Sequence, residues 1–185
     1  MCKKLSEKSE YLYGIDSSLS NTGVSIYDLN QHKFVFVGSV NTDKVYATKE
    51  FKGLNLHGLK LNKISNFLKE LTEKYPPKYI SIERGFSRFK NETQALFRVF
   101  GIIQEMFWDK PQELYPPNTV KSTIVHGHAD KNDLEKVIND RYKYITINND
   151  HESDAVAVAL TYLIKNKLIS WEKPDWEEIK KERDN

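Results

Sequence analysis

Short apolar segments separated by polar turns open the chain and predict three β-strands. Residues 11–15 and 23–29 are rich in apolar, β-branched and aromatic side chains, and the polar turn 17–21 lies between them. A third segment of this kind spans residues 32–39. Such residues are typical of strands, and short turns join antiparallel neighbours. The first forty residues therefore predict an antiparallel meander.

Helical periodicity follows the meander. Residues 54–74 predict a helix that ends before a Pro-Pro pair, and its apolar residues recur on one face: Leu61, Ile64, Phe67, Leu68 and Leu71. Residues 78–83 form a short apolar strand, residues 92–108 a second helix, and residues 114–115 a brief fifth strand. We expect one α/β domain, with a five-stranded mixed sheet flanked by helices.

Three further helices complete the predicted domain, at residues 118–125, 131–142 and 151–167. The last is apolar nearly all round, which predicts that it is buried. We divide the chain into a polar tail (1–10), this domain (11–169) and an acidic extension (170–185). The pattern leaves open whether the extension packs back on the domain or stays loose.

Composition excludes several classes of protein. Hydrophobic residues make up 39% and charged residues 29% of the 185 residues, and no apolar run approaches the roughly 18 residues of a membrane span. The single Cys2 excludes an internal disulfide framework and a cysteine zinc site. The polar start lacks the apolar core of a signal peptide. We expect a cytoplasmic protein with no membrane contact.

The net charge of +2 does not by itself indicate nucleic-acid binding, but its distribution is uneven. Residues 170–185 hold six acidic and four basic residues, so the rest of the chain is more basic than the whole. Residues 84–98 hold four basic residues against one acidic residue. Charge alone favours an ordinary solvated loop there.

Three acidic residues far apart in sequence are the candidate chemistry. Asp16 and Glu83 each end an apolar run, and Asp154 opens the apolar helix, with His151 three residues earlier on the same face. A buried carboxylate is unfavourable unless a positive charge neutralises it, and a divalent metal ion is a common solution. The pattern indicates a metal-dependent phosphoryl-transfer site.

Other readings of these acids are open. Asp16 could cap the turn that follows it, and Asp154 could be no more than a helix-start residue. Asp150 competes as the helix N-cap. A helix would point Glu152 about 100° away from His151, so we expect Glu152 to be solvated.

Four motifs in chain order resemble the RuvC-type Holliday junction resolvases of the ribonuclease H-like nuclease superfamily. They are Gly14-Ile15-Asp16-x5-Thr22-Gly23; Ile82-Glu83-x-x-Phe86, followed by Gln94 and Gly101; Val120-Lys121-x4-His126-Gly127-His128-Ala129-Asp130-Lys131; and His151-x-x-Asp154-Ala155. The third departs from the family pattern, because it keeps one glycine of two and is one residue shorter.

The resemblance implies a ribonuclease H-like fold and a homodimeric endonuclease that cuts four-way DNA junctions and leaves 5′-phosphate and 3′-hydroxyl ends. It implies two Mg2+ ions, for which Mn2+ can substitute, held by Asp16, Glu83 and Asp154. His151 would be a further ligand or a proton carrier. One ion would activate water and the other would stabilise the leaving oxygen. The helix at 92–108 would form the dimer seam.

The resemblance also implies DNA contacts. Lys121 and Lys131 would contact phosphates or stabilise charge at the cut, and Phe86 would stack on a splayed base. Further contacts to the DNA backbone would come from Arg84, Arg88 and Lys90. Three rivals share part of the pattern: a related nuclease acting on forks or RNA hybrids, a sugar-kinase or actin-like phosphotransferase, and a junction-binding module without activity. The phosphotransferase needs a second glycine-rich loop, which is absent after Gly127.

Overall fold

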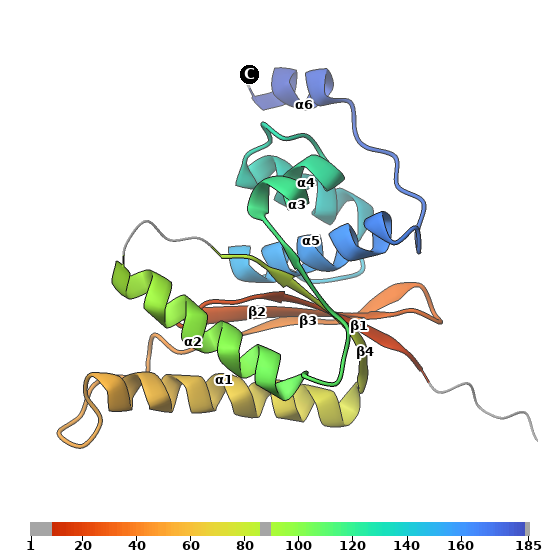
Figure 1. Ribbon diagram of the computed structural model, residues 1–185. Helices are drawn as coiled ribbons and strands as arrows, with labels where there is room; N and C mark the ends of the chain where they lie inside the picture. Colours follow the sequence, from red (N-terminus) through yellow and green to blue (C-terminus); the bar gives the residue numbers. More distant parts are fainter. Residues whose placement is uncertain (1–8, 86–89, 184–185) are drawn as a thin grey trace, which may run out of the picture.

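A five-stranded mixed sheet forms the centre of the molecule in the computed structural model, which describes residues 9–85 and 90–183 (Figure 1). The strand order is β3-β2-β1-β4-β5. The strands are β1 (Tyr11–Asp16), β2 (Asn21–Asp28), β3 (Lys33–Asn41), β4 (Pro77–Glu83) and β5 (Gln112–Tyr115). The first three pair antiparallel, and β4 and β5 run parallel to β1. The predicted meander and mixed sheet are confirmed.

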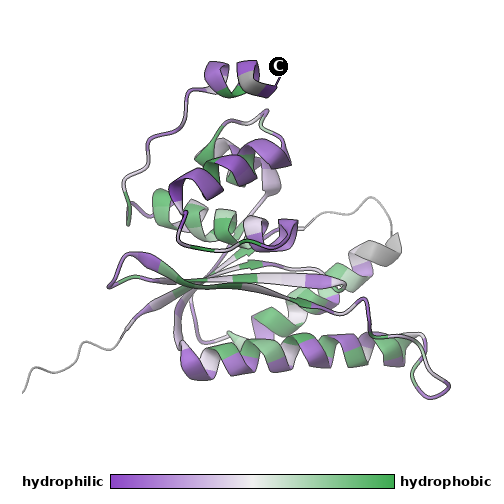
Figure 2. Cartoon of the chain, turned by 180° about the vertical axis from the view of Figure 1, so that it is seen from behind, coloured by the Kyte–Doolittle hydropathy of each residue, from purple (hydrophilic) through white to green (hydrophobic). Residues whose placement is uncertain are grey.

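Helices cover both faces of the sheet. On one face lie α1 (Leu54–Lys74) and α2 (Lys90–Met106); on the other lie α3 (Pro117–Ile124), α4 (Lys131–Arg141) and α5 (Asp150–Lys165) (Figure 1). Each face has its own cluster of buried apolar side chains, and hydrophobic residues gather where the helices meet the sheet (Figure 2). None of the helices in the described part of the chain is long and apolar enough to cross a lipid bilayer.

Helix α5 is buried, as its nearly uniform apolar pattern predicts. Two glycines let its backbone lie directly on the sheet. A Cβ atom at Gly14 would lie 2.2 Å from the carbonyl oxygen of Ala155, and one at Gly23 would lie 2.0 Å from that of His151. Because no side chain separates them, the first turns of α5 reach the strand that carries Asp16.

The acidic extension packs back on the domain and ends in a helix that the sequence did not predict, α6 (Trp176–Arg183). The indole Nε1 of Trp171 donates a hydrogen bond to the carbonyl oxygen of Ile124 at 2.9 Å. Trp176 stacks on the ring of His126 with centroids 4.8 Å apart. These aromatic contacts lie 47 or more residues apart in the chain, so local composition could not reveal them.

Candidate metal centre

Three acidic residues meet at one edge of the sheet. Asp16 and Glu83 are the last residues of β1 and β4, which are parallel neighbours, so both side chains stand at the same strand ends. Asp154 comes from α5, one turn after that helix begins. One carboxylate oxygen from each residue lies within 4.8 Å of the other two. The structure thus brings together the three acids proposed from the sequence.

Electrostatics in this cluster disfavour three negative charges. Burial, and then the charges of Asp16 and Asp154, raise the pKa of Glu83 to about 8. Burial also raises the pKa of Asp154, and the hydrogen bond from Lys131 offsets this only in part. A hard divalent cation prefers carboxylate oxygens and would relieve the repulsion. The donor set therefore fits such an ion.

His151 lies beside the three acids, bonded to one of them. Its Nδ1 is 2.6 Å from Oδ2 of Asp16. This hydrogen bond is the main cause that raises the pKa of His151, while burial acts in the opposite direction. The imidazole is in a position to orient Asp16 and to hold a proton at Nδ1.

Lys131 brings a positive charge to the cluster from the first residue of α4. Its Nζ lies 3.0 Å from Oδ2 of Asp154 and 3.8 Å from Oδ2 of Asp150. Partial burial acts to lower the pKa of Lys131, but the hydrogen bond and charge of Asp154 outweigh it and the pKa is raised. Lys131 is therefore a stable cation.

Other residues proposed from the sequence lie around this edge or outside the described structure. Arg84 is exposed directly after β4, and its backbone N–H donates to the carbonyl oxygen of Tyr115. Lys121 is half-buried on α3; in the described residues, no ion pair joins it to the acids. Phe86 and Arg88 lie outside the described residues, as does the side chain of Lys90.

The expectation for Glu152 is wrong. Its side chain is not solvated: the residue is 4% exposed and its carboxylate accepts a hydrogen bond from Ser39 on β3. The N-cap of α5 is Asn149, and Asp150 is the exposed first residue of the helix. A helix that is apolar nearly all round faces protein on every side, and this signal could have revealed the burial of Glu152.

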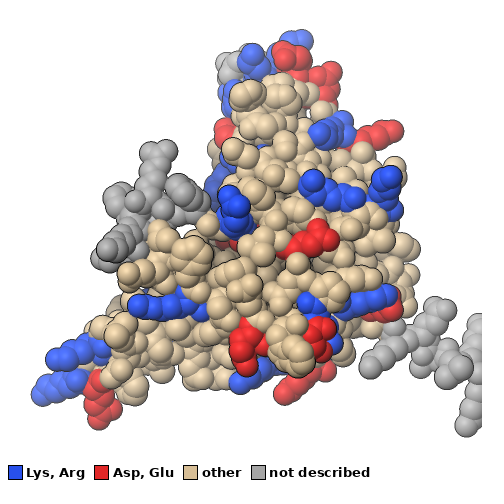
Figure 3. Space-filling view, viewed as in Figure 1, with Lys and Arg blue, Asp and Glu red and all other residues tan. Residues whose placement is uncertain are grey.

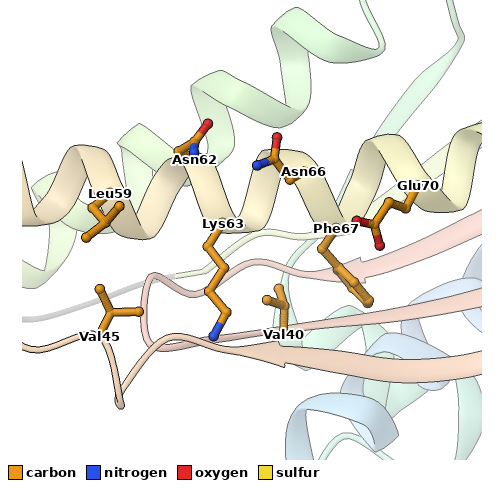
Figure 4. A pocket seen from close by; sticks show the side chains of 8 residues that line it. All are labelled: Val40, Val45, Leu59, Asn62, Lys63, Asn66, Phe67 and Glu70. Atoms are coloured by element: carbon orange, nitrogen blue, oxygen red, sulfur yellow. The ribbon is translucent and has the colours of Figure 1, made fainter.

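Two of the cavities in the described part of the chain differ in their relation to the acids. The larger, about 480 Å³, lies between α1 and the end of β3 (Figure 4) and includes Val40. Since alternate residues of a strand face opposite sides of the sheet, Val40 points away from the face that Ser39 shares with α5. The smaller cavity, about 270 Å³, includes Glu83, Arg84 and apolar side chains of α2. Only the smaller one borders the acidic cluster.

Side chains of both charges are present on one face of the molecule. Basic and acidic side chains lie interspersed on the face shown in Figure 3, in keeping with the net charge of +2. A single-sign field of the kind that steers nucleic acid is absent from that view of the described residues. The acidic cluster, and not the charge balance, carries the functional conclusion.

Comparison with known proteins decides the family. The family described as crossover junction endodeoxyribonuclease RuvC matches residues 12–162. The chain belongs to the RuvC family. A RuvC of Rickettsia typhi is 30% identical over 163 residues, which cover 83% of this chain and 97% of that protein. One of Wolbachia pipientis wMel is 28% identical over 159 residues, covering 82% and 92%.

Solved structures confirm the ribonuclease H-like fold expected of a RuvC family member. Thermus thermophilus RuvC in complex with a Holliday junction substrate superposes with a TM-score of 0.69 at 17% identity, covering 86% of this chain and 96% of that one. Fowlpox virus resolvase, solved with substrate Holliday junction DNA, gives 0.53 at 13% identity, covering 83% and 99%.

Proposed function

We propose that this chain is a metal-dependent endonuclease that resolves Holliday junctions, leaving 5′-phosphate and 3′-hydroxyl ends, and that it acts in the cytoplasm. The observation that carries the proposal is the meeting of Asp16, Glu83 and Asp154 within 4.8 Å. Membership of the RuvC family supports the reaction class. The junction bound in the Thermus thermophilus relative supports the substrate.

Each residue of the centre has a proposed role. Asp16, Glu83 and Asp154 hold two Mg2+ ions, or Mn2+ in their place. When bound, these ions supply positive charge that polarises the scissile phosphate and lowers the pKa of water. His151 holds Asp16 in position and takes up a proton at the ring. Lys131 neutralises Asp154 before DNA arrives and then faces the phosphate charge.

DNA contacts are proposed around the same edge. Arg84, Arg88, Lys90 and Lys121 would meet the phosphate backbone, and Phe86 would stack on a splayed base. The 270 Å³ cavity supports the contact at Arg84, because Arg84 lines it together with Glu83 of the acidic cluster.

The proposed enzyme is a homodimer, and α2 forms the interface between the two subunits. Phe97 on α2 and Trp108 just after it are 63% and 80% exposed. Gly101 lies between them at helical spacing, and a Cβ atom there would meet nothing within 4 Å. Two-fold symmetry would present one centre to each of two equivalent strands. Sedimentation at the concentration used for cleavage measures this, and a monomeric mass would contradict it.

The substrate is tested with labelled four-way, three-way, forked and RNA-hybrid duplexes, each incubated with Mg2+ or with a chelator. We expect paired nicks in the four-way junction that a ligase can seal, and no product with the chelator. Faster cleavage of forks or RNA hybrids than of four-way junctions would show that the protein acts on a different substrate. Tight junction binding with no cutting in any metal would indicate a binding module instead.

Lys131→Ala is expected to slow single-turnover cleavage by about 100- to 1,000-fold, the range for losing one electrostatic stabiliser of a transition state. Lys131→Arg keeps the charge and should recover part of the rate. Cleavage by Lys131→Ala at the wild-type rate would exclude the proposed role. The exposed Lys136 on α4 provides the matched control, Lys136→Ala.

A further inference from the structure

Glu152 is a buried carboxylate beside the acidic cluster that takes no part in the chemistry proposed above. Its Oε1 accepts hydrogen bonds from Ser39 Oγ and Asn149 Nδ2, both at 3.0 Å. Its Oε2 accepts from the backbone N–H of Asn148 at 2.8 Å and from the side-chain amide of Asn148 at 3.1 Å. Four donors satisfy both oxygens, which is what a buried charge requires to be tolerated.

These contacts belong to a row that crosses three strands at one level of the sheet. Asp16 of β1 pairs with Gly23 of β2, and Gly23 pairs with Ser39 of β3. The first turn of α5 lies across this row. His151 bonds Asp16, its carbonyl oxygen lies against Gly23, and Glu152 bonds Ser39. The helix is thus held at both ends of the row.

The two ends of the row together determine how α5 is rotated. Successive helical side chains point about 100° apart, so a helix tied to β3 through Glu152 has a fixed direction for His151 and Asp154. The close contact at Gly23 sets the height of the helix above the sheet, and the hydrogen bonds at the two ends of the row set the direction in which its first turn faces. Losing the tie on β3 would let the carboxylate of Asp154 move relative to Asp16 and Glu83.

We propose that Glu152 and Ser39 form a positioning pair that holds α5 so that Asp154 and His151 face the acids on β1 and β4. This inference rests on the proposed metal-dependent cleavage. Residues that orient a metal ligand typically contribute about 10- to 100-fold in metal affinity or activity. Neither Glu152 nor Ser39 contacts the reacting atoms in this proposal.

Ser39 offers the sharper test, because a matched pair of variants exists. Ser39→Ala removes the hydroxyl that bonds Glu152, whereas Ser39→Thr keeps it. Mn2+ binding to the metal-free full chain is measured by calorimetric titration without DNA, and single-turnover cleavage is measured at saturating metal. We expect Ser39→Ala to weaken Mn2+ binding and to slow cleavage by about tenfold each, and Ser39→Thr to restore both.

Glu152→Gln provides a second variant that does not depend on the strand residue. The amide puts an NH2 group where one carboxylate oxygen accepted two hydrogen bonds, so we expect the same direction of change. Junction binding in a gel shift without metal should stay within about twofold, since Glu152 is buried and is not among the proposed DNA contacts. The exposed Glu73→Gln on α1 is the control for the chemical change itself.

A purely structural role would lower the unfolding temperature while leaving Mn2+ affinity and the cleavage rate of folded protein unchanged, and that result overturns the inference. Failure of the proposed function looks different. If wild type cut no junction but Ser39→Ala still bound Mn2+ more weakly than wild type, the positioning role of Ser39 and Glu152 would be supported and the proposed substrate would be wrong. If wild type bound no Mn2+, the inference would fall as well.

Discussion

Asp16→Asn is expected to reduce junction cleavage by at least about 1,000-fold, more than the 10- to 100-fold typical of residues that only support a metal ligand. Asp16 sits between two functional groups: its carboxylate belongs to the acidic cluster and accepts a hydrogen bond from His151 at 2.6 Å. An amide keeps the shape but carries no negative charge. The variant therefore loses one negative charge from the proposed metal ligands. His151 also loses the carboxylate that raises its pKa, so the pKa of His151 should fall.

Binding and cutting should separate in this variant. We expect Asp16→Asn to retain four-way junction binding in a gel shift, because one fewer negative charge lowers the repulsion of phosphate. The exposed Asp140 on α4 gives the matched control, Asp140→Asn, which should cut at the wild-type rate. Cleavage by Asp16→Asn at the wild-type rate would show that the acidic cluster is not needed for the reaction.

Glu83→Gln is expected to stabilise the metal-free protein at pH 9 while it abolishes cleavage. The pKa of Glu83 rises from an ordinary 4.5 to about 8 in the folded state, through burial first and the neighbouring carboxylates second. The folded state therefore binds this proton more tightly than the unfolded state. Its contribution to stability is complete below about pH 4.5 and is lost as the pH rises to about 8.

Glutamine removes this dependence, because it does not titrate. One unit of pKa shift corresponds to about 1.4 kcal/mol, so we expect Glu83→Gln to raise the free energy of unfolding by at least about 1.4 kcal/mol at pH 9 in chelator. The gain should vanish near pH 4. Urea unfolding at both pH values measures it, with the exposed Glu73→Gln as the control.

Added metal should reverse the order of stability at pH 9. An ion that binds the folded state but not the unfolded state stabilises a protein. Wild type offers three carboxylates to the ion, whereas Glu83→Gln offers two. Mg2+ or Mn2+ should therefore stabilise wild type more than the variant. Equal unfolding free energies of the two proteins at pH 9, with and without metal, would contradict the electrostatic account of the cluster.

Local patterns in the sequence were sufficient for the helices and strands from β1 to α5 and for the three acids, but not for α6. Apolar and β-branched runs predicted the strands, and helical spacing predicted α1 within its observed bounds. Asp16 and Glu83 stood out because each ends an apolar strand, where a carboxylate needs compensation. These inferences needed only neighbours in the chain, since periodicity and local cost are properties of short segments.

Tertiary structure decided what each side chain faces. On the sheet, Glu152 accepts a hydrogen bond from Ser39, which lies 113 residues earlier in the chain. The helical pattern predicted the angle between the side chains of Glu152 and His151, but not which part of the protein Glu152 faces. Trp176 stacks on His126, which lies 50 residues earlier in the chain, and this contact shows that the acidic extension packs on the domain. A local pattern fixes direction about a helix axis, whereas the neighbour in that direction depends on how distant segments pack together. The sequence therefore determined which groups the site has, and the packing of α5 across β1, β2 and β3 decided how they are held.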